Sequence, residues 1–137
     1  YRNDNNMQYL TLEQLLQIHA LVLLKDGGAD GVGDAGRLEA AVASQYQVVF
    51  GEELYRSAHQ KSAAIIRGII NDHPFVDGNK RTGLLSGLTF LEINGYHFTA
   101  RKGELEDFAV HIATKRLEVD AIVAWLEHHT KPRAKAE

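Results

Sequence analysis

The chain of 137 residues contains no cysteine and only two prolines. The absence of cysteine excludes disulfide bonds and thiol chemistry, and it fits a reducing compartment such as the cytoplasm. No apolar run approaches the roughly 20 residues that a membrane-spanning helix needs, and we expect no signal peptide. The formal net charge of −3 provides no overall positive field that would attract nucleic acid. We therefore expect neither a membrane nor a nucleic acid as a direct partner.

Apolar residues make up 45% and charged residues 24% of the chain, which is the composition of an ordinary folded domain. The length predicts one such domain. Residues 1–6 are polar, and we expect them to be a cloning remnant or a disordered terminus, with Met7 as the natural start. The charged segment 131–137 is expected to be a disordered tail. The folded domain is thus predicted to span residues 7–130.

Helical periodicity runs through most of the chain. Thr11 and Gln14 form a capping-box pattern at the start of the first helical segment, which Gly27 ends. Further helices are expected over 37–44, 57–71 and 79–94, and two more follow. About six helices and no convincing sheet indicate an all-α domain. The residues expected to face its core are Leu12, Leu15, Leu16, His19, Val22 or Leu23, Leu38, Ala41, Val42, Ala63, Ile66, Ile69, Ile70, Leu84, Leu85, Leu88, Leu91, Leu105, Phe108, Ala109, Ile112, Ala113, Val119, Ile122, Val123 and Leu126.

Two segments lack helical periodicity. Residues 45–56 mix aromatic and β-branched side chains around Gly51, which predicts a loop or a small hairpin. Its exposed edge would suit pairing with a peptide, and the alternative is a loop that its aromatic residues fix to the core. Residues 96–99 are expected to form a short extended segment.

The most informative segment is residues 73–82, which read HPFVDGNKRT. It places an imidazole, a carboxylate, a glycine, an amide and two cations between two apolar helical segments. Pro74 disfavours αR geometry at His73 and ends the preceding helix. Phe75 is expected to anchor the turn in the core, and Gly78 allows a backbone conformation that other residues resist. Taken singly, each of these residues is most often an ordinary loop residue, but together they indicate a functional site.

Asn79, Lys80 and Arg81 open the next helix, whose first amides lack internal partners and carry the positive end of the helix dipole. This is an anion site, and the two cations oppose the dipole unless an anion binds. Asp77 conflicts with a bound anion unless a divalent cation such as Mg²⁺ lies between them. A neutral His73 is then a candidate general base for an attacking hydroxyl. Arg81 would grip phosphate with its fork, and Lys80 would act as a point charge.

The string HPFVDGNKR at residues 73–81 resembles the signature of the Fic/Doc superfamily, and it looks closest to the Doc branch, the death-on-curing toxins. Residues 36–42, 51–55 and 90–96 also look like Doc-like chains, so that the resemblance covers roughly 7–130. It implies an all-α Fic/Doc-type bundle with the segment 45–56 as a flap that aligns the target. It also implies chemistry with ATP and Mg²⁺ on a protein hydroxyl in the bacterial cytoplasm. The roles implied by position are general base for His73, Mg²⁺ ligand for Asp77, a shaped anion-binding turn for Gly78 and Asn79, and phosphate contacts for Lys80 and Arg81.

Lys80 decides which reaction we expect. Fic enzymes that transfer AMP usually carry glycine here, whereas Doc-like proteins carry lysine and are associated with phosphate transfer to a threonine of elongation factor Tu, which halts translation. Lysine fills room in the turn and adds charge, so that the nucleotide can bind reversed with its γ-phosphate toward the base. We therefore expect a toxin that is an ATP-dependent protein Ser/Thr kinase. The alternatives are a Fic-type AMP transferase and a catalytically silent antitoxin-binding or corepressor module.

Inhibition is expected to come from a separate chain. Many Fic proteins carry an inhibitory helix marked by Ser/Thr, three residues, Glu and then Gly/Asn, and residues 114–119 fail that pattern at its last position, Val119. The resemblance therefore implies a Phd-like antitoxin that supplies a helix over the site. Residues 31–36 match GxGxxG, but no strand precedes them and no βαβ pattern follows, so a flexible interhelix loop is expected rather than dinucleotide binding.

The remaining histidines are expected to be structural. His128 and His129 have no third metal ligand at suitable spacing, which favours a solvated helix end. His19, His97 and His111 are expected to be packing residues, and His59 is expected to face water.

Overall fold

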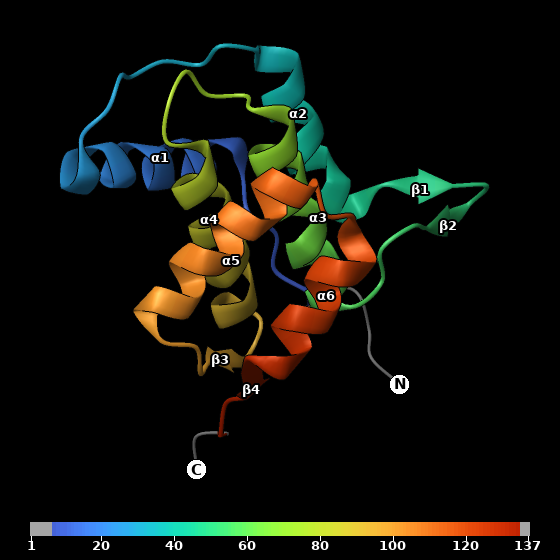
Figure 1. Cartoon of the computed structure of the whole chain (residues 1–137). Helices are drawn as coiled ribbons and strands as arrows, with labels where there is room; N and C mark the ends of the chain where they lie inside the picture. Colours follow the sequence, from blue (N-terminus) through green and yellow to red (C-terminus); the bar gives the residue numbers. More distant parts are fainter. Residues whose placement is uncertain (1–6, 135–137) are drawn as a thin grey trace.

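A computed structural model describes residues 7–134 of the chain. Residues 1–6 and 135–137, on which parts of the terminal expectations fall, lie outside the described residues. Figure 1 shows a helical domain from which one short hairpin projects. The prediction of an all-α domain is confirmed. Its helices are α1 (Leu12–Asp26), α2 (Ala35–Ala43), α3 (Ala58–Asp72), α4 (Asn79–Ile93), α5 (Lys102–Lys115) and α6 (Val119–His128), with a 3₁₀ turn, η2 (Ser44–Tyr46), after α2.

Helix α3 forms the centre of the core, and α2, α4, α5 and α6 all pack against it. Its predicted inward residues, among them Ile66 and Ile70, are fully buried. Helix α4 approaches α3 closely through two glycines. A Cβ at Gly87 would lie 2.3 Å from Ile66 Cγ1, and a Cβ at Gly83 would lie 2.7 Å from Ile70 Cγ1. This close packing holds the end of α3 and the start of α4 together, and the HPFVDGNKRT turn joins those two ends.

Helix α1 buries a narrower face than its sequence pattern predicts. Leu15, His19 and Val22 are buried as expected, but Leu12 and Leu16 are each 38% exposed. The expectation that these two leucines face the core is wrong because α1 lies at the edge of the bundle and has neighbours on one side only. The expectation that Leu85 on α4 faces the core is also wrong: it is 38% exposed and lines a cavity beside α4. The capping box of Thr11 and Gln14 is confirmed.

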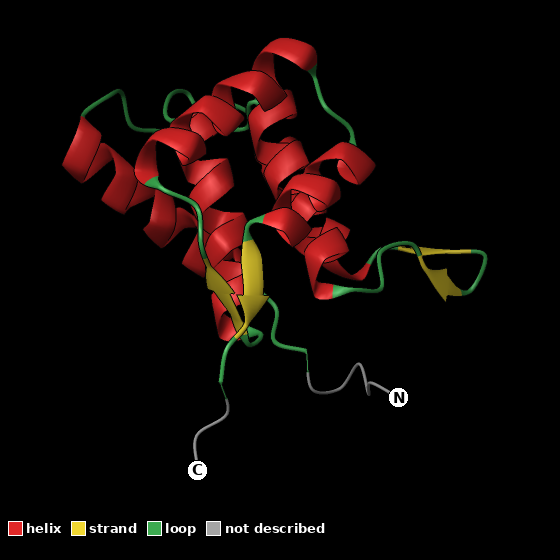
Figure 2. Cartoon of the chain, turned by 60° about the horizontal axis from the view of Figure 1, so that its bottom comes forward, coloured by secondary structure: helices red, strands yellow, loops and turns green. Residues whose placement is uncertain are grey.

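The segment 45–56 forms a hairpin, one of the two forms expected for it. Strand β1 (Val48–Val49) pairs antiparallel with β2 (Glu52–Glu53), and Phe50 at the tip is fully exposed. Figure 2 shows the hairpin extending away from the helices. Lys61 of α3 holds its base: the buried Nζ donates to Glu53 Oε1 at 2.7 Å and to the Gln45 carbonyl at 2.5 Å.

A second strand pair joins distant parts of the chain. The expected extended segment is β3 (Tyr96–Phe98), and it pairs antiparallel with β4 (Thr130–Pro132). Lys131 and Pro132 therefore depart from the tail predicted to be disordered from residue 131 onward, because strand pairing with β3 holds them. Pro132 is tolerated because β4 is an edge strand.

Three histidines differ from their expected surroundings. His59 is buried rather than facing water, since its ring hydrogen-bonds to Thr130 Oγ1 at 2.8 Å and meets Tyr96 edge-on. His97 and His111 are exposed rather than packed: His97 alternates outward from β3, and His111 lies on the outer side of α5. None of the described helices has the length and apolar character required to span a membrane.

Candidate functional site

The turn between α3 and α4 begins at His73, which has left-handed backbone geometry with φ 51° and ψ 60°. Its N–H still donates to the Ile69 carbonyl at 3.2 Å, so it caps α3. Pro74 follows and disfavours αR geometry at the residue before it, as the sequence predicted. His73 is exposed at this end of the turn.

Phe75 anchors the turn, as predicted, and His19 provides the surface on which it rests. The Phe75 side chain is 2% exposed, and its ring stacks on the His19 imidazole with centroids 3.8 Å apart. His19 Nε2 also hydrogen-bonds to the Asp77 carbonyl at 2.8 Å. The expectation that His19 is a packing residue is confirmed, and the ring additionally fixes the middle of the turn to α1.

Asn79 closes the turn from inside. Its side-chain oxygen accepts from the Phe75 N–H at 2.9 Å, and its side-chain nitrogen donates to the Phe75 carbonyl at 2.8 Å. Gly78 has φ 78° and is the N-cap of α4, a conformation that glycine adopts without strain. Because the Asn79 side chain serves the backbone of the turn, the amides at the start of α4 keep one fixed arrangement.

Asp77 is an ionised carboxylate held by two backbone amides. Ala29 N–H donates to Oδ2 at 3.1 Å, and Gly78 N–H donates to Oδ1 at 2.8 Å. These two hydrogen bonds, that from Ala29 foremost, hold the pKa of the Asp77 carboxyl below its usual value. The contact with Ala29 requires the chain after α1 to pass very close, since a Cβ at Gly28 would lie 2.8 Å from Asp77 Oδ2.

The two cations of the motif have different surroundings. Lys80 is exposed. The Arg81 guanidinium lies between two carboxylates from other helices, at 3.3 Å from Asp26 of α1 and 3.1 Å from Glu106 of α5. Sequence reasoning missed both acids, because each lies on a helix whose charged residues have no pattern that distinguishes a paired from a solvated carboxylate.

A cavity of about 610 Å³ lies beside the start of α4, between α1, α4 and α5. Its lining includes five of the predicted site residues, and most of the remainder is apolar. His73 is not among the described residues that line the cavity. The structure therefore brings the predicted metal and phosphate residues to one cavity and places the predicted base at the other end of the same turn. The five are Asp77, Gly78, Asn79, Lys80 and Arg81.

The single carboxylate of Asp77 fits a magnesium ion whose other ligands are phosphate oxygens and water. Within the described part of the chain, no group of three or more His, Cys, Asp or Glu side chains could hold a metal alone. Mg²⁺ is commonly held by one or two carboxylates, with phosphate oxygens and water completing its shell. Asp77 supplies one exposed, ionised carboxylate next to a helix N-terminus that favours anions.

The glycine-rich segment 31–36 is attached to the turn rather than being a free loop. Val32 forms an antiparallel bridge with Phe75, and the Val76 N–H donates to the Gly31 carbonyl at 3.0 Å. The expectation of a flexible loop is therefore wrong in this respect, because these backbone contacts hold the segment against the turn. Dinucleotide binding gains no support, since a loop and not a strand precedes α2.

The model of the Fic/DOC family matches residues 9–91, which include α1 to α3, the turn and most of α4. This chain belongs to the Fic/DOC family. The protein "Toxin Doc" of Mycolicibacterium smegmatis is 36% identical over 121 residues, which cover 87% of this chain and 91% of that relative. The "Protein kinase doc" of Escherichia phage P1 is 33% identical over 116 residues, which cover 85% of this chain and 90% of that relative.

This Fic/DOC chain has a break where the partial match to an inhibitory helix lies. Helix α5 ends at Lys115, Arg116 has left-handed geometry with φ 49°, and α6 begins only at Val119. Residues 114–119 are thus a helix junction and not one helix. This agrees with the failure of the inhibitory pattern at its last position.

Proposed function

We propose that this Fic/DOC chain is the toxin of a bacterial toxin–antitoxin pair and that it transfers a phosphate from ATP to a protein hydroxyl in the cytoplasm. The observation that carries the proposal is the turn itself, in which an ionised Asp77 lies beside the α4 N-terminus and the exposed His73 begins the same turn. The relatives named as a toxin and as a protein kinase support the same activity.

His73 is the proposed general base. Its exposure leaves room for the hydroxyl of a macromolecular substrate. A neutral imidazole takes the hydroxyl proton while the hydroxyl oxygen bonds to the γ-phosphorus, and the bond to the bridging oxygen breaks to release ADP. The remaining groups of the turn act by holding charge in place, which is the main contribution of protein to phosphoryl transfer.

Asp77 is the proposed Mg²⁺ ligand, and the start of α4 is the proposed phosphate site. Mg²⁺ would neutralise phosphate charge when ATP is bound. Gly78 and Asn79 would shape the anion-binding turn, and Lys80 and Arg81 would contact phosphates from the cavity that they line. Lys80 supports phosphate rather than AMP transfer, since its side chain takes up part of the space beside the turn and adds a charge there.

The cavity between α1, α4 and α5 is the proposed site for the helix of a Phd-like antitoxin. Its apolar lining reaches the surface at Leu21, which is 64% exposed, and at Val110, which is 53% exposed. An amphipathic helix that buries such side chains would also cover the residues at the start of α4. The antitoxin would therefore block the phosphate site directly.

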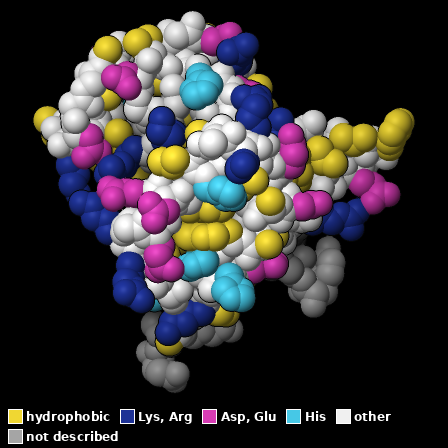
Figure 3. All heavy atoms as spheres, viewed as in Figure 1, with side chains coloured by type: hydrophobic (Ala, Val, Ile, Leu, Met, Phe, Trp, Pro, Cys, Tyr) yellow, Lys and Arg dark blue, Asp and Glu magenta, His cyan; other side chains and the backbone are white. Residues whose placement is uncertain are grey.

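The β1–β2 hairpin is the proposed flap for the substrate. Figure 3 shows hydrophobic side chains gathered along this projection, and Phe50 at its tip is fully exposed. By family resemblance the substrate segment carries a threonine of elongation factor Tu. An extended segment of this kind can pair with the edge of the hairpin.

Mass spectrometry of elongation factor Tu after incubation with the protein, ATP and Mg²⁺ tests the proposal. A gain of one phosphate that is lost with His73→Ala is expected, while His97→Ala, which removes another exposed histidine, should keep the activity. A gain of AMP instead would replace the kinase with an AMP transferase. An unmodified substrate, or full activity of His73→Ala, would contradict the proposed reaction.

A further inference from the structure

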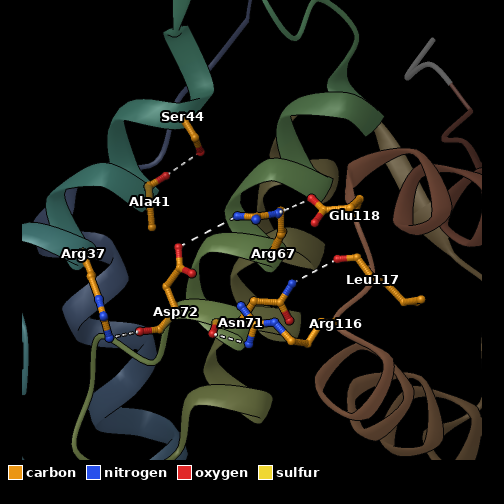
Figure 4. A network of polar contacts seen from close by, with 9 residues as sticks. All are labelled: Arg37, Ala41, Ser44, Arg67, Asn71, Asp72, Arg116, Leu117 and Glu118. Carbon is orange, nitrogen blue, oxygen red and sulfur yellow. Dashed lines mark hydrogen bonds and ion pairs between the residues drawn. The ribbon is translucent and has the colours of Figure 1, made fainter.

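The C-terminal end of α3 is held by an arginine that the proposed reaction does not use. Arg37 comes from the first turn of α2, and its Nη1 donates to the Asp72 carbonyl at 3.0 Å. Figure 4 shows this contact at the end of a polar network around the last turn of α3. Asp72 directly precedes His73, so the arginine grips the peptide unit on the N-terminal side of the proposed base.

The same segment grips the other side of His73. The Pro74 carbonyl accepts from the Gly33 N–H at 2.8 Å and from the Asp34 N–H at 3.0 Å. The carbonyls of the residues before and after His73, Asp72 and Pro74, are thus both held by residues 33–37, at the start of α2. None of these three backbone contacts involves the imidazole, so they leave it free for chemistry.

Asp34 connects the two grips. Its Oδ1 accepts from the Arg37 N–H at 3.0 Å as the N-cap of α2, and its Oδ2 lies 3.4 Å from Arg37 Nε. The residue whose amide holds Pro74 therefore also orients the arginine that holds Asp72. A hydrogen-bonded unit of this kind transmits the position of α2 to the backbone on both sides of His73.

His73 needs such support because of its backbone conformation. A non-glycine residue with φ 51° lies in a sparsely populated region, and it stays there only where surrounding contacts determine it. The core contribution of Arg37 is small, since its side chain is 59% exposed. The contact with Asp72 is therefore poorly explained by packing and well explained by the geometry of the residue that follows.

We propose that Arg37 is a positioning residue for His73 and that Asp34 holds Arg37 in place. The catalytic consequence rests on the proposed function of His73. With Arg37 removed, the α3 end relaxes and the imidazole samples orientations that do not reach the hydroxyl. Misplacement of a reacting group by about 1 Å costs on the order of 10²-fold in rate, so kcat falls. The affinity for nucleotide is unchanged, because nucleotide binding uses other residues.

The test compares three variants of the full chain. Arg37→Gln removes the guanidinium, Arg37→Lys keeps a cation that can reach one acceptor, and Arg67→Gln is the matched control. Arg67 belongs to the same network, but it pairs with side chains only, Glu118 at 2.7 Å and the Asp72 carboxylate at 3.9 Å. Circular dichroism and thermal unfolding measure the folded fraction of each variant.

Two readouts are recorded. The first is the set of backbone NMR shifts of His73, which report its left-handed φ without any reaction. The second is phosphate transfer, as kcat and as KM for ATP. We expect Arg37→Gln to move the His73 resonances and lower kcat by about 10- to 100-fold with KM changed less than about twofold. Arg37→Lys should recover part of both effects, and Arg67→Gln should show neither.

Unchanged His73 resonances in Arg37→Gln overturn the positioning role, as does a loss of kcat that only follows the folded fraction. A wild-type protein that transfers no phosphate refutes the proposed function and leaves the resonances of Arg37→Gln and Arg67→Gln to decide the positioning role. The same effect in both of these variants also overturns it, because it would show that any charge removed from this network suffices.

Discussion

At the scale of single residues, the geometry of Asp77 depends on a residue outside the motif. Gly28 has φ 121° and passes so close that an added Cβ would contact Asp77 Oδ2 at 2.8 Å and Cγ at 3.2 Å. The carboxylate would have to turn away from the Ala29 N–H that it now accepts from. The predicted metal ligand is therefore positioned by the loop after α1.

Gly28→Ala is expected to weaken binding of a non-hydrolysable ATP analogue with Mg²⁺ by roughly tenfold, because the Asp77 carboxylate loses its orientation. Isothermal titration calorimetry measures this. Gly27→Ala is the matched control, since Gly27 also has positive φ, 79°, but a Cβ there meets nothing within 4 Å. Both variants should also lose stability, by roughly 1 to 3 kcal/mol, from backbone strain at these positive φ values. Equal losses of affinity in the two would refute a specific role for Gly28.

His59 makes stability depend on pH. Burial lowers its pKa, against a smaller opposing effect of Glu127. The native state thus disfavours the proton, and stability is fully present above the unfolded pKa of about 6.5 and declines as the pH falls below it. His59→Gln keeps a partner for Thr130 without titrating. Urea unfolding between about pH 7.5 and pH 5 should show a smaller decline for this variant than for the wild type. Parallel curves would contradict the assignment.

Sequence patterns identified the residues of the turn but not their partners. The composition of residues 73–82 sufficed to select His73 and Asp77, because a turn of this kind has no use in a core. The partners Ala29, Asp26 and Thr130 lie about 50 or more residues from the groups that they contact. No local periodicity or spacing carries that information, so His59 was expected to face water and the acids that pair with Arg81 were not identified.

At the scale of secondary-structure elements, capping residues and glycines predicted where helices begin and end. The spacing of apolar residues predicted less well which helix face is buried. Thr11 and Gln14 located the start of α1 because a capping box is a local hydrogen-bonding pattern. The burial of Leu12 and Leu16 depends instead on whether another helix lies opposite, and α1 has none there. Strand β4 was missed because its partner, β3, is distant in the sequence.

Lys61 holds the base of the β1–β2 hairpin, and its removal tests that contact. Lys61 is fully buried and holds both Glu53 and the Gln45 carbonyl. Lys61→Met should cost about 3 kcal/mol, because a buried carbonyl and a partly buried carboxylate lose their contact with the Lys61 ammonium. Hydrogen exchange across the β1–β2 hairpin should also become faster. Urea unfolding and exchange measured by NMR test both effects.

The control for Lys61 is an exposed ion pair of the same hairpin. Arg56 contacts Glu52 of β2, and both side chains are well exposed. Arg56→Met should therefore cost less than about 1 kcal/mol. Equal losses of stability in Lys61→Met and Arg56→Met would show that burial of the Lys61 ammonium adds nothing to its contacts with the hairpin.

At the scale of the whole molecule, Arg81 is the point where three helices meet. It belongs to α4 and bridges Asp26 of α1 to Glu106 of α5 across one end of the cavity. The same guanidinium is the proposed phosphate contact. If that proposal holds, the two acids would compete with phosphate for the guanidinium, and the ion pairs would loosen when a nucleotide binds.

Asp26→Asn combined with Glu106→Gln removes both competitors while keeping the shape of the side chains. We expect the double variant to bind a non-hydrolysable ATP analogue with Mg²⁺ about tenfold more tightly at low salt, and the gain should shrink as salt screens the added charge. Stability should fall by no more than about 1 kcal/mol, since all three side chains are partly exposed. Isothermal titration calorimetry at two salt concentrations measures the gain.

Glu92→Gln is the control, because Glu92 pairs with Arg133 and not with Arg81. It removes a similar negative charge from a distant part of the surface, so its effect reports net charge alone. An equal gain with Glu92→Gln would assign the effect to net charge. Weaker binding by the double variant would contradict the competition. It would show that Asp26 and Glu106 orient the Arg81 guanidinium toward phosphate, so that an arginine released from both acids loses the geometry that binding requires.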